Sequence, residues 1–276
     1  MPAERALSAA EAQGEAERLD SAEVRATQIG QSTLRFPDMT IADAYAVQAA
    51  WLDLRLARGE RVIGHKIGLT SRAMQAAMRI STPDSGFLTD AMQFAPGATL
   101  DAGRFCDPKL ELELAFKLAD DLTGAGLSVD DVLDATEYVV PAVELIAART
   151  HRVDPQTGRP RTVVDTIADN AADAGIVCAA TPVGPRELDL RWVGAIGSRN
   201  GTVEETGLAA GVLGHPAEGI AWLARRYGEH GAHRLRAGDV VLAGSFTRPI
   251  DVRPGDEFHF DYGALGTFGL TFAART

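Results

Sequence analysis

The sequence is poor in cysteine, in long apolar runs and in positive charge. Its two cysteines, Cys106 and Cys178, lie far apart and form no CxxC motif, which favours neutral buried thiols over a disulfide or a zinc site. No uncharged apolar run approaches the roughly 20 residues that cross a bilayer, and charges spread over the N-terminal segment leave no apolar signal core. The 38 acidic residues exceed the 27 basic ones and give a formal net charge of −11, which argues against general binding to nucleic acid or anionic lipid. We therefore expect a soluble, cytoplasmic protein that binds neither nucleic acid nor membrane.

Helical patterns occupy the first sixty residues. Apolar residues are sparse over residues 7–28, so we expect one exposed or partner-covering helix there. A second helix is predicted from Ile41, because Thr40 and Asp43 form an acidic capping box, and Gly59 is expected to end it.

Short apolar runs separated by turn residues follow residue 60. Strands are predicted at residues 62–69, 110–118, 138–147, 175–180, 192–198, 202–206, 240–245, 258–262 and 267–272. Asn200-Gly201 predicts a tight hairpin between two of them, and one later helix is predicted from Pro216. The pattern indicates an α+β protein, with an N-terminal helical region at residues 1–60 and a strand-rich catalytic body at residues 61–276.

Three glutamates form the clearest candidate site. Glu111 and Glu113 alternate with leucines, so they share one face of a strand, and Glu144 lies inside an apolar run where a lone charge is costly. An ordinary solvent-facing strand would explain the first pair, and a salt bridge to Arg149 would explain Glu144. The alternative is an all-oxygen metal site of Glu111, Glu113 and Glu144, which suits Mg²⁺ or Mn²⁺.

A second group of candidates lies near the Gly-flanked run around Lys66. Apolar neighbours would desolvate this lysine, lower its pKa and make it an acid or base, unless it extends its ammonium group to the surface. Asp84 follows in a segment that is typical of a turn. Asp165 and Asn170 belong to a polar loop, where they could bind substrate or cap a helix. Ser245 and Arg248 end an apolar strand, and Arg248 could grip a carboxylate in bidentate fashion or remain at the surface.

Taken together, these motifs resemble the fumarylacetoacetate hydrolase superfamily and its 2-keto-4-pentenoate hydratase branch. The similar segments are residues 44–48, 64–71, the Glu111/Glu113 strand, Glu144, residues 165–172, 199–207 and 244–249. The resemblance implies a mixed, rolled β-sheet of the C-terminal type of that superfamily, and homo-oligomers built as pentamers or decamers. It implies that Glu111, Glu113 and Glu144 bind a divalent metal, usually Mg²⁺, while Lys66 and Asp84 handle protons.

The resemblance also implies the reaction, which is addition of water to a 2-oxo-enoic acid or diacid in aromatic meta-cleavage catabolism. The loop at residues 154–159 and Ala172 favour a seven-carbon dioate over a pentadienoate as substrate, and Arg248 is then the candidate for the distal carboxylate. Ser85 departs from the pattern, because an aromatic residue is expected there. A related decarboxylase, a pentadienoate hydratase and a non-catalytic partner subunit of a decarboxylase remain alternatives. A hydrolase that cleaves 1,3-diketones is less expected, since no His-acid pair is evident beside the metal strand.

Overall fold

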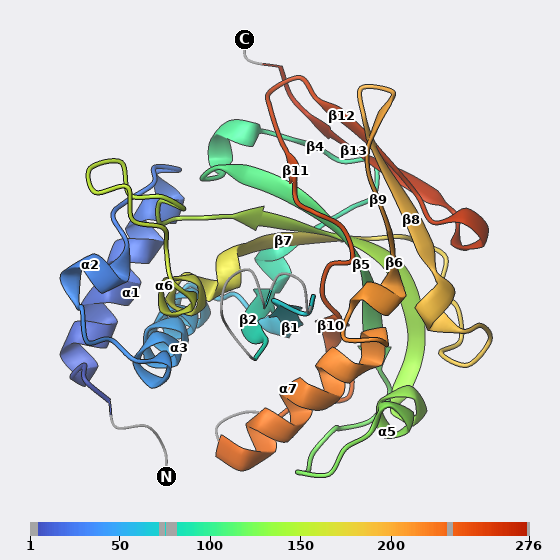
Figure 1. Cartoon of the computed structure of the whole chain (residues 1–276), viewed down its shortest axis with the longest axis horizontal. Coiled ribbons are helices and arrows are strands. Elements are labelled where there is room, and N and C mark those ends of the chain that lie inside the picture. The colour runs from blue at the N-terminus through green and yellow to red at the C-terminus, as the bar shows by residue number, and fades with distance from the viewer. Residues whose placement is uncertain (1–4, 72–74, 76–81, 231–233, 275–276) are drawn as a thin grey trace.

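Three helices open the chain in the computed structural model, which describes residues 5–71, 75, 82–230 and 234–274 (Figure 1). They are α1 (Ala9–Val24), α2 (Ser32–Arg35) and α3 (Ile41–Ala57). The predicted capping box of Thr40 and Asp43 begins α3, and Gly59 follows its end with a φ of 93°. Ser8 and Glu11 cap α1 in the same way.

The expectation that the first helix is exposed is wrong. One face of α1 is buried against α3, and this face is built mainly from alanines, which let the two helices approach closely. Leu19 of α1 and Trp51 of α3 are fully buried in a small core that also takes in Ile167 of α6 (Val163–Ala168). The residue pattern hid this face because alanine carries little apolar surface. The predicted division of the chain at residue 60 stays a prediction.

A large mixed sheet forms the body of the protein. Its strands run in the order β2-β1-β10-β5-β6-β7-β3, with β11 also paired to β5. β1 pairs with β10 and β3 with β7 in parallel, and the other pairs are antiparallel. The bounds are β1 Val62–Gly68, β2 Asp84–Thr89, β3 Gln93–Phe94, β5 Pro108–Leu118, β6 Thr136–Ala147, β7 Asp173–Cys178, β10 Val240–Leu242 and β11 Ile250–Asp251.

A second sheet packs beside the first and runs in the order β4-β13-β12-β8-β9. Its strands are β4 Thr99–Leu100, β8 Gly194–Arg199, β9 Thr202–Leu208, β12 Glu257–Asp261 and β13 Thr267–Phe272. The predicted hairpin joins β8 to β9, where Asn200 and Gly201 both have positive φ angles. The predicted late helix is α7 (Pro216–His230), and the short helix α5 is Val129–Asp134. The α+β prediction with a mixed sheet is confirmed.

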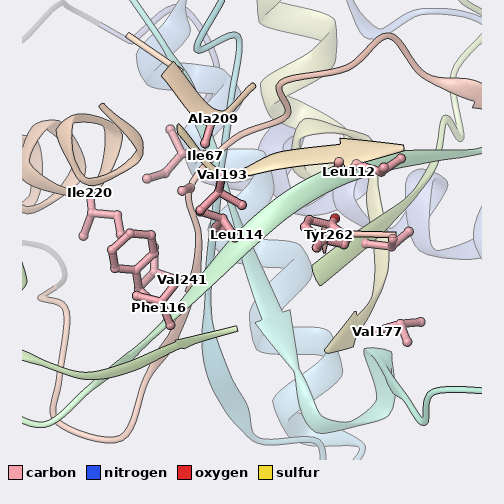
Figure 2. Packing of buried hydrophobic residues seen from close by; sticks show 14 of the residues in the cluster. Ile67, Leu112, Leu114, Phe116, Val177, Val193, Ala209, Ile220, Val241 and Tyr262 are labelled. Atoms are coloured by element: carbon pink, nitrogen blue, oxygen red, sulfur yellow. The ribbon is translucent and has the colours of Figure 1, made fainter. Parts of the chain in front are cut away.

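The main hydrophobic core lies along β5. Leu112, Leu114 and Phe116 project from this strand into the cluster shown in Figure 2, and each is fully buried. Burial of each such side chain contributes roughly 1.5–3 kcal/mol. This apolar face holds β5 in register and turns the alternate glutamates to the opposite side.

The two thiols are free, as predicted. Burial raises the pKa of Cys106 to about 11 and that of Cys178 to about 12. Among the described residues, no helix is long and apolar enough to cross a membrane.

Candidate active site

The three predicted glutamates meet at the centre of the large sheet. The antiparallel register of β5 and β6 sets Glu111 directly opposite Glu144, and Glu113 lies two residues along the same face. One carboxylate oxygen from each of the three lies within 4.8 Å of the others. Glu113 and Glu144 are both buried, and the Gly244 N–H donates to Glu113 Oε2 at 2.8 Å. The strand periodicity therefore predicts this cluster correctly.

The three carboxylates carry more negative charge than the neighbouring cations balance, and some of their oxygen atoms have no hydrogen-bond donor in the described part of the chain. Glu113 Oε1 and Glu144 Oε2 are buried and have no well-formed hydrogen bond to any described residue, while Glu144 Oε1 is paired with Lys66. Burial, followed by the charge of Glu144, raises the pKa of Glu111 to about 7 and the pKa of Glu113 well above its usual range. A divalent cation would satisfy these oxygens and remove the repulsion, and an all-oxygen donor set fits a hard ion.

Lys66 reaches into this cluster from β1. Its Nζ lies 3.0 Å from Glu144 Oε1 and donates to the Ala171 carbonyl at 3.1 Å, and the side chain is buried. Burial alone would lower the pKa of Lys66, but the carboxylates of Glu144, Asp84, Asp173 and Glu111 raise it above its usual range. The predicted lowering is wrong, because the sequence pattern did not reveal how many acids surround the ammonium group.

Asp84 faces Lys66 from the neighbouring strand. It is not a turn residue as predicted, because it opens β2 opposite Gly68 and is buried. A Cβ atom at position 68 would lie 2.2 Å from Asp84 Oδ1, so a side chain there would displace the Asp84 carboxyl group. Neither carboxyl oxygen has a well-formed hydrogen bond to the described residues, and burial raises the pKa of this group. Asp84 is therefore a buried, weakly hydrogen-bonded carboxyl group close to a charged lysine.

A strained turn closes the site behind Lys66. Asn170, Ala171 and Ala172 have φ angles of 50°, 51° and 62°, a left-handed conformation that costs roughly 1–2 kcal/mol per residue. The Asn170 amide holds the turn in place, because it accepts from the Phe87 N–H at 2.9 Å and donates to the Phe87 carbonyl at 3.0 Å. The same turn presents the Ala171 carbonyl to Lys66.

Comparison with known proteins identifies the family. Residues 63–273 match the family described as fumarylacetoacetate (FAA) hydrolase, C-terminal. The chain belongs to the fumarylacetoacetate hydrolase family.

Relatives within the family are enzymes of similar length. The chain is 52% identical over 257 residues to the 2-oxo-hept-4-ene-1,7-dioate hydratase of Escherichia coli, which covers 93% of this chain and 96% of that protein. It is 39% identical to the 2-hydroxyhexa-2,4-dienoate hydratase of Comamonas testosteroni over 95% of this chain and 97% of the relative. The structure of 4-oxalocrotonate decarboxylase from Pseudomonas putida G7, complexed with magnesium and adipate, matches with a TM-score of 0.92 and 34% identity over 98% of this chain and 100% of that one. This protein is thus an enzyme of the hydratase and decarboxylase group of the family.

Four residues predicted to bind substrate have other contacts in this family member. Asp165 caps α6, and its carboxylate accepts from the N–H and hydroxyl of Thr33 at 2.8 and 2.9 Å. Asn170 holds β2 as described above. Ser245 donates to the Thr247 carbonyl at 3.0 Å. The Arg248 side chain is 82% exposed and pairs with Glu205 at 2.7 Å. Roles for these four side chains in substrate binding stay predictions.

The sequence did not identify Asp173 as a buried acid of the site, and it suggested the wrong partner for Glu144. Asp173 at the start of β7 is buried, its Oδ2 has no hydrogen bond to the described residues, and its charge raises the pKa of Lys66. An acid just before the apolar run at residues 175–180 was a usable signal for it. The proposed salt bridge between Glu144 and Arg149 is wrong, because Arg149 Nε donates to Asp169 Oδ1 at 2.6 Å.

Ser85 and His65 illustrate how strand alternation sorts side chains. Ser85 is buried beside Tyr45, and the Arg226 guanidinium lies 3.6 Å from the Tyr45 ring centroid, so an aromatic ring from α3 is supplied next to the position where one was expected.

A His-acid pair, which the sequence did not reveal, is present on β1, where His65 Nε2 lies 3.8 Å from Asp239 Oδ2. Because His65 alternates with Lys66 along β1, it faces Tyr227 of α7 and not the glutamate cluster.

Proposed function

We propose that this enzyme is a Mg²⁺-dependent hydratase of 2-oxo-hept-4-ene-1,7-dioate. The product would be 2,4-dihydroxyhept-2-ene-1,7-dioate, the enol tautomer of the 4-hydroxy-2-oxo acid. The observation that carries the proposal is the 52% identity to the Escherichia coli hydratase over 93% of this chain. The buried cluster of Glu111, Glu113 and Glu144 supports it, since three carboxylates leave room on a six-coordinate ion for a chelating 2-oxo acid.

Glu111, Glu113 and Glu144 would hold the metal in this reaction. When bound, a divalent ion supplies positive charge that stabilises the negative charge developing on the C2 oxygen of the substrate. Mg²⁺ is favoured over Mn²⁺ because the similar decarboxylase structure is complexed with magnesium.

Lys66 and Asp84 would move the protons. Conjugation of the double bond with the ketone needs one proton removed at C3 and one delivered at C5. Water then adds at C4, and a proton goes to the C2 oxygen to give the enol, or to C3 to give its 2-oxo tautomer. The two groups are buried on facing strands, so proton transfer would proceed away from bulk water. Lys66 carries a proton in this environment, and Asp84, a weakly hydrogen-bonded carboxyl group close to it, can accept one.

We further infer a cytoplasmic homo-oligomer, a pentamer or decamer. Four large apolar side chains are exposed on and beside β8 and β9, and the exposed fraction of the Trp192 side chain is 72%. They are Trp192, Ile196, Val203 and Leu208. An apolar surface of this kind is typical of a contact between copies of one chain. Sedimentation of the pure protein would test this, and a monomer at micromolar concentration would refute it.

The main competing function is decarboxylation of 4-oxalocrotonate. The TM-score of 0.92 to the Pseudomonas putida decarboxylase favours it, while the lower identity of 34% disfavours it. Hydration of a 2-keto-4-pentenoate is a further alternative. A non-catalytic partner subunit has less support, because α1 buries its apolar face within this chain.

One assay separates these functions. The purified enzyme is given 2-oxo-hept-4-ene-1,7-dioate, 2-hydroxypenta-2,4-dienoate and 4-oxalocrotonate in parallel, with and without Mg²⁺. We expect Mg²⁺-dependent loss of conjugated ultraviolet absorbance with the dioate, and a product heavier by one water. Release of CO₂ from 4-oxalocrotonate without water addition to the dioate would instead identify a decarboxylase.

A further inference from the structure

A hairpin beside Asp169, which precedes the left-handed turn behind Lys66, places two arginines side by side. The Arg161 N–H donates to the Arg152 carbonyl at 2.9 Å, and Val153 bridges to Pro160 in antiparallel register. Asp154 stabilises the turn between them, because its Oδ1 accepts from the N–H groups of Gln156 and Thr157 at 3.1 and 2.7 Å. We call residues 151–161 the arginine hairpin.

The N-terminal helical region fixes the position of this hairpin. Gln31 Nε2 donates to the carbonyls of His151 and Arg159 at 3.2 and 3.0 Å, and the His151 N–H donates to the Ile29 carbonyl at 3.0 Å. In Figure 1 the hairpin accordingly lies beside α1 and α6. Hydrogen bonds within the chain therefore fix the hairpin backbone.

Each of the two guanidinium groups has one buried nitrogen atom without a hydrogen-bond partner among the described residues. Arg161 Nη1 and Arg152 Nη2 are buried and have no hydrogen bond to any described residue. Arg152 uses its Nε on Asp107 at 2.8 Å, while the nearest carboxylate oxygen to Arg161, on Asp169, is 4.0 Å away and already accepts from Thr150. Neighbouring Arg149 differs, since each nitrogen of its guanidinium donates a hydrogen bond, to Asp169 or to the Asp173 carbonyl.

The arginine hairpin lies beside the turn that contacts Lys66, because Arg161 Nη1 is 4.0 Å from Asp169 and Ala171 of the same turn accepts from Lys66. Burial raises the pKa of Asp84, and the charge of Lys66, followed by that of Arg161, opposes this rise. Burial, together with repulsion from Arg152, lowers the pKa of Arg161 to about 10. A bound anion would remove that repulsion, and a carboxylate matches the fork of a guanidinium.

We propose that Arg161, supported by Arg152, binds the distal carboxylate of a dicarboxylic substrate. This inference rests on the proposed function and deepens it, because it names the side chains that distinguish a dioate from a monocarboxylic 2-oxo-enoate. It replaces Arg248 in that role, since the Arg248 side chain is 82% exposed and already paired with Glu205.

The test compares Arg161→Met with Arg248→Met and with Arg104→Met, an exposed control. In the presence of Mg²⁺, kcat/KM is measured for 2-oxo-hept-4-ene-1,7-dioate and for 2-hydroxypenta-2,4-dienoate. We expect Arg161→Met to lower the dioate value by on the order of 10- to 100-fold and to change the pentadienoate value by less than about threefold, because a charged hydrogen bond contributes about 1.5–3 kcal/mol. Arg104→Met should change neither value. Equal loss for both substrates, or a selective loss in Arg248→Met alone, would overturn the inference.

A binding measurement keeps this test independent of the proposed reaction. Calorimetric titration of the Mg²⁺-loaded protein with adipate and with hexanoate compares two carboxylates with one on the same six-carbon chain. Wild type should bind adipate more tightly, and Arg161→Met should remove that preference while Arg161→Lys keeps part of it. If the wild type hydrates neither substrate but shows this pattern, the proposed function fails and the carboxylate site stands. An adipate affinity that is unchanged in both folded variants refutes the site.

Discussion

Two groups of side chains at the candidate site, an acidic wall and the arginine hairpin, differ in the sign of their charge and in the hydrogen-bond partners they lack. The acidic wall consists of Glu111, Glu113, Glu144, Asp84 and Asp173, and it contains buried carboxylate oxygens without well-formed hydrogen bonds to the described residues. The arginine hairpin contains buried guanidinium nitrogens that are likewise without hydrogen bonds within the part of the chain the structure describes. A cation would satisfy the oxygen atoms of the acidic wall, and an anion would satisfy the nitrogen atoms of the hairpin. A metal ion and a dianionic substrate would satisfy both walls at once.

The opposite charges of the two walls are consistent with a dianionic substrate in a protein whose formal net charge is −11. Net charge describes the surface as a whole, whereas the site is governed by a few buried groups. A dication held by the glutamates, with Lys66 and the two arginines of the hairpin, would make the pocket locally positive.

The largest effect is expected from removing one charge of the acidic wall. Glu113→Gln should lower Mg²⁺-dependent turnover by on the order of 10³-fold or more, because a catalytic metal contributes several kcal/mol. Mg²⁺ affinity, measured by calorimetry, should fall in parallel. Glu137→Gln is the control, since it makes the same change at an exposed position of β6. Full turnover of Glu113→Gln in the presence of a chelator would show that the acidic wall does not hold a catalytic metal.

On the basic side, the largest effect should come from Asp169→Asn. This change leaves the buried Arg149 guanidinium without its carboxylate, and breaking a buried ion pair typically costs about 3–5 kcal/mol. The free energy of unfolding in urea measures the loss. Asp130→Asn, in an exposed pair with Arg186, should cost about 1 kcal/mol or less. Equal losses in the two variants would mean that Asp169 does not anchor the arginines.

The strained turn that joins the two walls gives a smaller effect. Asn170→Ala removes both hydrogen bonds to the Phe87 backbone and puts alanine at a φ of 50°, so we expect a loss of about 2 kcal/mol in the free energy of unfolding. Asn200→Ala is a matched control, because Asn200 also has a left-handed φ and two amide hydrogen bonds but lies in an exposed hairpin. Its loss should be about 1 kcal/mol. A greater loss at Asn200 would contradict the importance of the buried clamp.

The two walls also differ in how far the sequence predicts them. The alternation of residues along β5 sufficed to place Glu111 and Glu113 on one face, and an apolar run around Glu144 identified a costly buried acid. The strand register that brings Glu144 opposite Glu111 is a regular consequence of pairing. Periodicity thus predicts side chains on regular strands.

The arginine hairpin has no such periodicity. Arg152 and Arg161 are nine positions apart in a polar loop, and they become neighbours only through cross-chain backbone bonds and through Gln31, which is 120 or more residues away in sequence. Strand β2 was missed for a related reason, because the turn-like residues before it gave no sign that Asp84 is paired and buried. The sequence likewise did not show that nearby acids outweigh burial in setting the pKa of Lys66.

The smallest effect is a pH dependence of the acidic wall alone. In the metal-free protein the pKa of Glu111 is raised to about 7, so the folded state holds a proton that the unfolded chain loses near pH 4.5. Its contribution to stability is therefore complete below that pH and is lost as the pH rises to about 7. Since Mg²⁺ must displace such protons, its stabilising effect should grow with pH.

Thermal unfolding with and without saturating Mg²⁺ tests this sign. The gain in Tm at pH 8 should exceed the gain at pH 5.5 by a few degrees, which corresponds to about 1 kcal/mol for a chain of this size. Glu113→Gln should show little gain at either pH, because its cluster lacks one of the three carboxylates. Arg161→Met should keep the wild-type pattern, since the hairpin is proposed to bind substrate and not metal. A larger gain at pH 5.5 would mean that the glutamates are already ionised in the metal-free protein, and the charge imbalance attributed to the acidic wall would then be wrong.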